Sequence, residues 1–415
     1  MTHYVTLMHR AIMSNPELNS RIPPKPNSRT PFADLKLPNE NDPDLLLGSE
    51  VREDLSLVTS QTWQFLLRHL DPNTALPIDR VEQLAGDIRL VEVTSPTNIA
   101  LALLSCITAN QLGYADVSET TRLVSQMLES LETLETCQGF FLNWYHTDSC
   151  KPVECWPALP EETNCPVEKF VSSVDNGWLV AGLLMAKECL PQLQTRVDHL
   201  LKRMNFKTLF NETNSSFFGG IHQTGRPTDY CYPREFLSEA RILYYVSFLL
   251  GHIDRKVLIE YLDNMPSLSY GGSIFEALMP LLAFDEHLSS DTIFTLIKSQ
   301  QQAGAMYGYW GYSPCDDPGS TYKEFGTGAY ETNGFEVVTP HALMLTLSYA
   351  PYEVLTILQR LVTETLVWSE NGFVDSANVV KNEVSNSWLF LDQAMIFLAI
   401  SQLLSEEVKK KKITV

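Results

Sequence analysis

Residues 236–250 read FLSEARILYYVSFLL and are apolar on nearly every face of a helix, apart from Glu239 and Arg241. A helix of this composition is typical of a protein interior. A carboxylate placed there is costly unless it is paired, protonated or turned toward a wet cavity. The stretch therefore predicts a buried helix that carries Glu239 in an unusual environment.

A second stretch repeats this pattern near the end of the chain. Residues 388–404 read WLFLDQAMIFLAISQLL, and Asp392 is their only formal charge. Two acids in two buried helices favour a pocket lined by carboxylates. Such a pocket suits acid/base chemistry on a neutral polar substrate such as a sugar.

The composition excludes several other classes of function. Acidic residues number 50 and basic residues 30 among 415, a formal net charge of -20. This charge disfavours nucleic acid and anionic membrane surfaces as partners. No segment has the roughly 18 continuous apolar residues of a membrane span, and the N-terminus shows no secretory signal. We therefore expect a cytoplasmic protein, although export by a non-standard route stays open.

Three regions follow from the distribution of residue types. Residues 1–50 are rich in Pro, Asn and Asp and predict an extended arm, residues 51–405 a single domain, and residues 406–415 a basic tail. From residue 51 onward, helical patterns alternate with loops, and no alternating segment demands a sheet. About a dozen helices of three to four turns fit this space. An all-α toroid with apolar inner helices is expected, with an α-solenoid as the alternative.

Several helix boundaries are marked by short signals. Ser-Pro and Thr-Pro pairs predict N-caps with a first-turn proline, Ser-x-x-Glu predicts a capping box, and a late glycine predicts a C-cap. The residues are Ser95-Pro96, Thr339-Pro340, Asp175 as a further N-cap, Ser273 with Glu276, and Gly251. Between the helices lie long loops rich in glycine and aromatics, which are usually functional: residues 139–162, 217–233 and 306–331.

Six blocks, in order, resemble the glycoamylase-like family. That family includes the endo-β-1,2-glucanases and the glucan-processing domains of cyclic β-1,2-glucan synthases. The blocks are TSPTNIALALLSCITANQLGY (94–114), GFFLNWYHTDSCKP (139–152), FVSSVDNGWLVAGLL (170–184), FLSEARILYYVSFLLG (236–251), GGSIFEALMPLL (271–282) and GFVDSANVVKNEVSNSWLFLDQAMIFLAI (372–400). The resemblance implies an (α/α)6 barrel and a glycoside hydrolase that acts on a β-glucan, in particular a β-1,2-glucan. We expect no metal and no organic cofactor.

The resemblance places a catalytic glutamate at Glu239 and a second carboxylate at Asp392. Glu239 would be the general acid, and burial would raise its pKa as a proton donor requires. The alternative is a structural Glu bonded to Arg241 or to a neighbouring helix. Asp392 would be the general base or would position the water, and the alternative is an Asp held by a helix N-terminus. An inverting pair is separated by about 6.5–9.5 Å, but related glucanases pass the proton through a substrate hydroxyl, so a longer separation is also compatible.

The same blocks supply a predicted sugar-binding set. Aromatic rings stack on sugar faces, and polar groups fix the hydroxyls. The set is Asp175, Glu276, Arg241, Trp144, Tyr145, Trp178, Tyr309, Trp310 and Trp388. For the two acids, helix capping is the alternative; for each aromatic side chain, the alternative is packing in the core.

The chain also departs from the family. His146 replaces the usual Asp, Ala394 replaces a frequent Gly, residues 150–166 form an insertion, and the acids Asp316, Asp317 and Glu324 have no assigned role. Two rival functions therefore stay open beside hydrolysis: transfer of glycosyl groups to another sugar, and a catalytically silent module that binds a glycan or a partner. A lyase on an unrelated toroid is a weaker third.

Overall fold

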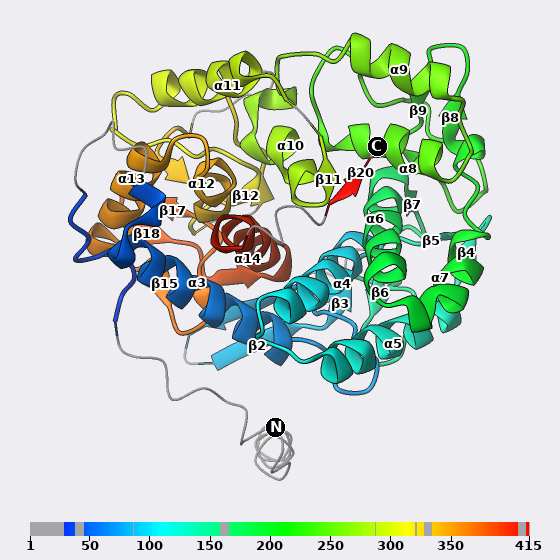
Figure 1. Cartoon of the computed structure of the whole chain (residues 1–415), viewed down its shortest axis with the longest axis horizontal. Coiled ribbons are helices and arrows are strands. Elements are labelled where there is room, and N and C mark those ends of the chain that lie inside the picture. Colours follow the sequence, from blue (N-terminus) through cyan, green and yellow to red (C-terminus); the bar gives the residue numbers. More distant parts are fainter. Residues whose placement is uncertain are drawn as a thin grey trace.

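The computed structural model describes residues 29–37, 45–85, 87–157, 166–286, 288–319, 322–327, 334–405 and 412–414. Three predicted segments lie wholly or partly outside these residues: the arm before residue 29, part of the insertion, and most of the lysine run in the tail. The described part is mostly helical (Figure 1). Its α-helices are α3 (Ser49–Arg68), α4 (Pro96–Gln111), α5 (Val117–Thr133), α6 (Ser173–Cys189), α7 (Gln194–Leu201), α8 (Ile242–Leu249), α9 (Arg255–Asp263), α10 (Ile274–Leu278), α11 (Ser290–Ala303), α12 (Pro340–Thr346), α13 (Pro351–Glu364) and α14 (Phe390–Leu404).

Short strands and 3-10 turns connect these helices, and the described part of the chain is mostly helical, as the sequence predicts. The 3-10 turns are η1 (Leu45–Leu47), η2 (Pro191–Leu193), η3 (Phe206–Leu209), η4 (Glu239–Arg241), η5 (Tyr270–Gly272) and η6 (Met279–Leu282). The strands are β1 (Arg80–Leu84), β2 (Asp87–Val91), β3 (Val93–Thr94), β4 (Thr136–Cys137), β5 (Phe140–Phe141), β6 (Tyr145–His146), β7 (Val171–Ser172), β8 (Phe210–Asn211), β9 (Ser216–Phe217), β10 (Gly220–Ile221), β11 (Phe284–Asp285), β12 (Cys315–Asp316), β13 (Tyr322–Lys323), β14 (Val337–Val338), β15 (Trp368–Ser369), β16 (Gly372–Phe373), β17 (Ala377–Asn378), β18 (Glu383–Val384), β19 (Ser387–Leu389) and β20 (Ile413–Thr414). Most span two residues, which is too short for an alternating pattern to show in the sequence.

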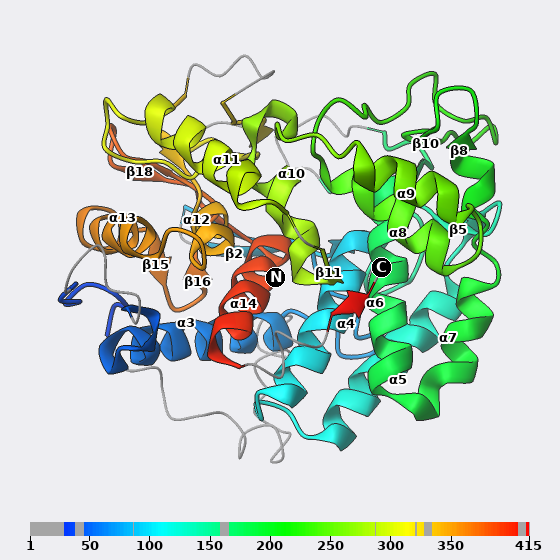
Figure 2. The ribbon, with the colours of Figure 1, turned by 45° about the horizontal axis from the view of Figure 1, so that its top comes forward.

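The helices fall into two classes that follow from their sequences. α4, α12 and α14 are buried on almost all faces, whereas α5, α11 and α13 bury one side only. The buried helices pack in sequence: α4 contacts α6, α6 contacts α8, the η4–α8 segment contacts α10, α10 contacts α12, α12 contacts α14, and α14 contacts α4. Figures 1 and 2 show α3, α5, α7, α9, α11 and α13 outside this group. Apolar helices therefore occupy the centre, and amphipathic ones cover them.

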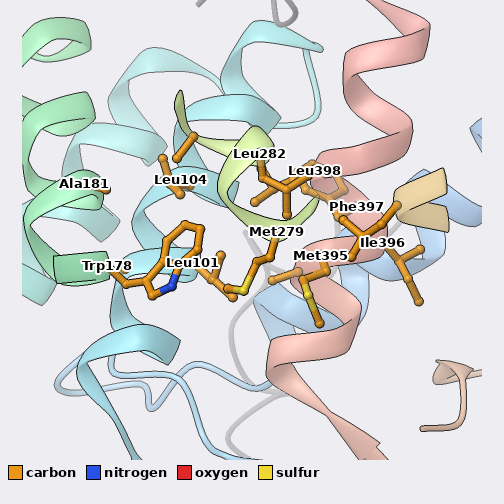
Figure 3. Close-up of a cluster of buried hydrophobic side chains, with 14 of the residues drawn as sticks. Leu101, Leu104, Trp178, Ala181, Met279, Leu282, Met395, Ile396, Phe397 and Leu398 are labelled. Atoms are coloured by element: carbon orange, nitrogen blue, oxygen red, sulfur yellow. The ribbon is translucent and has the colours of Figure 1, made fainter. Parts of the chain in front are cut away.

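Buried apolar side chains form a cluster where α4, α6, η6 and α14 meet (Figure 3). Leu101 and Leu104 of α4, Met279 of η6 and Phe397 of α14 are all buried there. α4 and α6 approach closely because Gly182 has no side chain: a Cβ at this position would lie 2.9 Å from the Cα of Ala100. The close approach fixes the spacing between two neighbouring inner helices.

Short antiparallel ribbons lie directly before four inner helices. β3 pairs with β6 before α4, β7 with β10 before α6, β14 with β17 before α12, and β19 with β1 before α14. Each ribbon holds the chain extended up to the residue where the helix begins. The first turns of the inner helices are therefore anchored by backbone hydrogen bonds.

Extended, hydrogen-bonded backbone shifts two predicted helix starts. Leu237 bonds through its backbone to Leu268 and Tyr270, so the segment predicted as a helix over residues 236–250 becomes helical only at Glu239. Likewise residues 387–389 form β19, and α14 begins at Phe390. Both predicted acids consequently lie in a first helical turn rather than inside a helix.

The predicted caps are mostly confirmed. Ser95 accepts from the nitrogen of Asn98 at 3.1 Å, Ser273 accepts from the nitrogen of Glu276 at 3.5 Å, and Gly251 follows α8 with φ at 71°. The predicted N-cap at Asp175 is wrong, because Ser172 caps α6 and Asp175 lies in its first turn. Thr339 precedes α12 as expected, but its hydroxyl donates to the carbonyl of Gly311 instead of capping the helix.

The two outermost described segments pack on the helical body. Near the start, the nitrogen of Phe32 donates to Asp54 of α3, and Arg29 pairs with the same carboxylate at 2.7 Å. At the other end, Ile413 and Thr414 form β20, which pairs in parallel with β11 after η6. Within the described part of the chain, no helix is both long enough and apolar enough to cross a membrane.

Candidate active site

Polar side chains occupy the first turn of every inner helix. They are Thr97 on α4, Asp175 on α6, Glu239 at the start of η4 before α8, Glu276 on α10, His341 on α12 and Asp392 on α14. Helix N-termini present unpaired N–H groups and a partial positive charge, which stabilise a nearby carboxylate. The fold therefore gathers these side chains at one end of the inner helices, in two acidic centres.

Glu239 is the centre of the first group. Its Oε2 accepts a hydrogen bond from the indole nitrogen of Trp178 at 2.7 Å, and its backbone nitrogen donates to Oε2 of Glu276 at 3.0 Å. Burial raises the pKa of Glu239 well above its ordinary value, and the negative charge of Glu276 raises it further. Burial also raises the pKa of Glu276 to about 7. The pair can hold a proton at neutral pH.

Asp175 extends this first centre. Its Oδ1 accepts from the Thr97 hydroxyl at 2.5 Å, and burial raises its pKa. With the Asn143 amide oriented to satisfy both neighbours, its nitrogen donates to Asp175 Oδ2 at 3.1 Å and its oxygen accepts from the Trp144 indole at 3.2 Å. Trp144 is half-buried and meets Trp156 edge-on at 4.8 Å. This chain of hydrogen bonds links Asp175 to an aromatic pair in the loop after β5.

Arg241 lies beneath this centre and is fully buried. Its Nε donates to both oxygens of Glu286 at 2.8 and 2.9 Å, and its other nitrogens donate to the backbone carbonyls of Ser238, Glu276 and Ala277. Glu286 also accepts from the Tyr245 hydroxyl at 2.6 Å. The guanidinium therefore ties the start of η4 to α10, and it is not hydrogen bonded to Glu239, whose side-chain partner is Trp178.

Asp392 is the centre of the second group, together with Asp375 and His341. Nδ1 of His341 lies 3.3 Å from Oδ1 of Asp392, and all three side chains are buried. Burial raises the pKa of Asp392 to about 7, raises that of Asp375 well above its ordinary value and lowers that of His341 to about 4. The charge of Asp392 raises the pKa of Asp375 further, whereas a hydrogen bond with Asp375 lowers the pKa of Asp392, so the two carboxyls behave as one coupled unit.

Further charged groups surround this unit. Arg80 of β1 donates to Asp79 at 2.9 Å and to Asp316 at 2.7 Å. Asp316 also accepts from the Ser387 hydroxyl at 3.0 Å, and its backbone nitrogen donates to Asp375 Oδ2 at 2.7 Å. The sequence suggested no role for Asp316. In the structure it lies between Arg80 and the coupled carboxyls.

Two tyrosines lie next to these acids. Burial raises the pKa of the Tyr232 hydroxyl, and the charges of Glu239 and Asp175 add to the shift. Tyr322 remains 57% exposed as a whole. Nevertheless burial raises the pKa of its hydroxyl, as do charges that include Asp375 of the second centre and Glu239 of the first. The hydroxyl of Tyr322 is therefore within electrostatic reach of both centres.

The predicted aromatic side chains divide into two groups. Trp178 contacts Glu239, Trp144 lies near Asp175, and Trp388 lies in β19 beside α14 with its buried indole nitrogen unpartnered. Tyr145 is fully buried, with its hydroxyl bonded to the backbone of Glu135 and Leu142. Tyr309 bonds Glu364 and lies under Arg360, and Trp310 is buried beside it. Tyr145, Tyr309 and Trp310 are therefore packed in the core, which is the alternative that the sequence left open.

Sequence reasoning missed Asp375, His341 and Arg80. Asp375 lies in the last of the six blocks, directly after the apolar Gly-Phe-Val. It is 17 residues before Asp392 in the sequence, and nothing in the sequence pairs the two acids. His341 follows the Thr-Pro helix start. Its position in the first turn of a helix is the feature of the sequence from which its role could have been predicted. His341, Asp375 and Asp392 are also the group, within the described residues, whose spacing could hold a metal ion.

Family models confirm the resemblance predicted from the sequence. Residues 259–412 match the glycoamylase model, described as "Putative glucoamylase", and residues 58–244 match a model of a family of unknown function, DUF3131. The chain is also 27% identical over 146 residues to the cyclic beta-(1,2)-glucan synthase NdvB of Rhizobium meliloti (strain 1021). That match covers 35% of this chain and only 5% of NdvB.

Solved structures share the fold over most of the chain. A putative glucoamylase from Bacteroides fragilis NCTC 9343 superposes with a TM-score of 0.69 at 15% identity, covering 86% of this chain and 92% of that one. Endo-beta-1,2-glucanase from Chitinophaga pinensis, in complex with sophorotriose and glucose, gives 0.66 at 15% identity over 86% and 93%. Endo-beta-1,2-glucanase from Talaromyces funiculosus with sophorose gives 0.63 at 12% identity over 88% of each chain. At these identities the likeness is one of fold.

Proposed function

We propose that the protein is a glycoside hydrolase that cleaves a β-1,2-glucan by an inverting acid/base mechanism. The observation that carries the proposal is the pair of buried acidic centres, built on Glu239 and Asp392, at the same end of the inner helices. The fold is shared with endo-β-1,2-glucanases that have been solved with β-1,2-linked sugars, which supports the choice of substrate.

Glu239 is proposed as the general acid. A general acid must keep its proton near neutral pH, and burial together with the charge of Glu276 raises the pKa of Glu239 in that direction. The Trp178 indole fixes one carboxyl oxygen at 2.7 Å. The other oxygen is then the one that donates a proton to the glycosidic oxygen of the substrate.

Asp392 is proposed as the general base. In the sequence of packed inner helices, α8 and α14 are separated by two helices on either side, which is the arrangement of opposite positions in a closed ring. Inversion needs a base on the face of the sugar opposite the acid, with room for a water molecule or a relaying hydroxyl between them. Asp316 and Asp375 hold the surrounding network, and Asp392 removes the proton.

The same packing supports the finer architecture that we propose, an (α/α)6 barrel. α4, α6, α8, α10, α12 and α14 would be the inner ring, and α3, α5, α7, α9, α11 and α13 the outer one (Figure 2). We propose residues 51–405 as one catalytic domain with residues 1–50 as its arm and residues 406–415 as its tail.

The sugar-binding set that we propose is smaller than the set predicted from the sequence. It keeps Asp175, Glu276, Trp144 and Trp388, which lie at or beside the two centres. It leaves out Tyr145, Trp178, Tyr309, Trp310 and Arg241, because their rings or polar atoms are engaged within the protein. Arg241 instead positions the start of η4, and with it Glu239.

The test is product analysis with a matched pair of variants. Purified protein is incubated with linear β-1,2-glucan, with β-1,3- and β-1,4-glucans as substrate controls. Glu239→Gln removes the acid and keeps the hydrogen-bond acceptor, whereas Glu235→Gln makes the same change at an exposed residue nearby. We expect short β-1,2-oligosaccharides from the wild type and from Glu235→Gln, and a loss of about 100-fold or more for Glu239→Gln. Proton NMR of the fresh product should show the α-anomer.

The rival functions predict other outcomes. Longer or cyclic glucans among the products would indicate glycosyl transfer instead of hydrolysis. A β-anomer in the fresh product would refute inversion. Binding of glucan without turnover, unchanged by Glu239→Gln, would indicate a silent binding module. An unsaturated product that absorbs in the ultraviolet would indicate a lyase.

A further inference from the structure

We infer that His341, Asp375 and Asp392 form a binding site for one divalent transition-metal cation. This inference goes beyond the proposed function, since neither hydrolysis nor substrate binding requires a metal there. One ligand atom from each of the three side chains can be chosen so that all three lie within 4.8 Å of one another. The residues come from α12, the segment after β16, and α14, three elements fixed by the core.

The first support is a set of buried polar atoms that lack partners. Nδ1 of His341, Oδ1 of Asp375 and Oδ2 of Asp392 accept or donate no hydrogen bond within the described residues, and their side chains are almost completely buried. Unpaired polar atoms in a protein interior are rare and costly. The three atoms belong to side chains that lie together, and one cation among them would supply the partner that each atom lacks.

The second support is charge. Arg80 is the cation beside this centre, and its guanidinium is already bonded to Asp79 and Asp316. Within the described residues, no lysine or arginine side chain pairs directly with Asp375 or Asp392. A bound dication would cancel both carboxylate charges, which is the usual condition for burying such a pair.

The donor set indicates the class of metal. One imidazole nitrogen and two carboxylate oxygens suit first-row transition metals such as Zn²⁺ and Mn²⁺ better than the all-oxygen sites of Ca²⁺ and Mg²⁺. Histidine binds a metal through its neutral imidazole. Bond lengths of about 2.0–2.2 Å place tetrahedral ligand atoms roughly 3.4 Å apart, so the ligand atoms that are farthest apart must approach by up to about 1.4 Å when a cation binds.

A surrounding contact already orients one of the ligands. The backbone nitrogen of Asp316 donates to Asp375 Oδ2 at 2.7 Å, which leaves Oδ1 for the cation. A hydrogen bond of this kind to the outer atom of a ligand is typical of metal sites.

A bound cation would have a consequence for the proposed reaction. It would coordinate Asp392, the group proposed to remove a proton from water, and a carboxylate bound to a dication is a poor base. The loaded protein is therefore expected to be the inactive form, and removal of the cation should restore hydrolysis.

The experiment measures bound metal directly. The full-length protein is stripped with a chelator, exposed separately to excess Zn²⁺ and Mn²⁺, desalted and analysed by inductively coupled plasma mass spectrometry. We expect about one ion per chain of at least one of the two metals. His341→Gln and Asp375→Asn should retain less than about a tenth of that, whereas His222→Gln, a half-buried His outside the site, should retain all of it.

Two further measurements on the wild type test metal binding even if the variants fail to fold. The midpoint of thermal unfolding should rise with the concentration of the bound metal, as mass action requires. Co²⁺ should produce a visible absorption band that the Zn²⁺-loaded protein does not develop. Metal binding by a protein that hydrolyses no glucan supports the site and counts only against the proposed function.

The inference is overturned if the folded wild type retains neither metal and shows no metal-dependent change in its unfolding midpoint. It is also overturned if folded His341→Gln and Asp375→Asn retain as much metal as the wild type. Either result would mean that a proton shared between Asp375 and Asp392 satisfies their oxygens.

Discussion

The carboxylate of Glu276 accepts the backbone N–H of Glu239, so the two side chains are linked within the turn where η4 begins. Once Glu276 ionises, its charge opposes ionisation of Glu239 and raises the pKa of that residue. The Trp178 hydrogen bond acts in the opposite direction. The pKa of Glu239 therefore depends on the balance between one neighbouring charge and one neighbouring dipole.

Glu276→Gln should shift the alkaline limb of the rate profile. The substitution removes the negative charge, so the pKa of Glu239 falls and the general acid loses its proton at a lower pH. We expect the alkaline limb of kcat/KM on β-1,2-glucan to move down by about one pH unit. The measurement is kcat/KM across the neutral range, with Glu235→Gln as the control, and an unmoved limb would contradict the coupling.

The same residue should affect stability in an unusual direction. The pKa of Glu276 is about 7 in the folded chain and ordinary in the unfolded chain, so the folded state binds more protons between these values. Stability from this group is full below its unfolded pKa and is lost as pH rises through the folded pKa, with a slope of at most about 1.4 kcal/mol per pH unit. Glu276→Gln should flatten that part of the curve of unfolding midpoint against pH.

At the scale of single residues, the acids of the site could be predicted, but their partners could not. Glu239 and Asp392 stand out because each is a lone charge in an apolar stretch. Asp375 lies in the segment after β16 and Arg80 lies in β1, and both meet Asp392 only through the fold. Burial of Arg241 could be predicted from its helix, but its pairing with Glu286 needed the packing of η4 against α10.

At the scale of the element, the close contact between α4 and α6 can be tested by Gly182→Ala. The new Cβ would lie 2.9 Å from the Cα and 3.0 Å from the carbonyl oxygen of Ala100. Overpacking costs about 1–3 kcal/mol, whereas alanine gains about 1 kcal/mol in helix propensity. We expect a net loss of about 1 kcal/mol in the free energy of unfolding, measured as a lower midpoint of thermal unfolding.

Lys187→Ala on the same helix is the control for this prediction. Lys187 makes an exposed ion pair with Asp198, and such a pair contributes roughly 0–1 kcal/mol. A Gly182→Ala protein as stable as the wild type would show that the two helices can separate without cost.

Helix starts were predictable where a cap and a proline coincide, as at Ser95-Pro96. They were misplaced where extended, hydrogen-bonded backbone precedes the helix, as before Glu239 and Phe390. A pairing such as β19 with β1 joins residues about 300 positions apart along the chain. Local periodicity carries no information about such a pairing.

At the scale of the whole molecule, β20 fastens the end of the chain to the body at the far ends of the inner helices. β11 follows η6, and η6 follows α10, so this contact lies away from the first turns that hold the acids. Ile413 is buried there, and its nitrogen donates to the carbonyl of Ala283 at 2.9 Å. The contact supports stability rather than the chemistry.

Ile413→Ala should therefore destabilise the fold and leave the reaction unchanged. Removal of the buried side chain should cost about 2 kcal/mol in the free energy of unfolding. Thr414→Ala, at the exposed neighbour, should cost little. The unfolding midpoint and kcat on β-1,2-glucan, measured side by side, separate the two effects, and a fall in kcat at temperatures where Ile413→Ala stays folded would refute the separation.

The placement of one polar side chain in the first turn of each inner helix also makes the molecule a scaffold for engineering. Each of these positions is followed by a mostly buried helix, which holds the polar side chain in place from below. A combinatorial library restricted to Thr97, Asp175, Glu239, Glu276, His341 and Asp392 would vary the reactive groups and leave the buried helices unaltered. Directed evolution of new sugar chemistry could therefore begin from six codons.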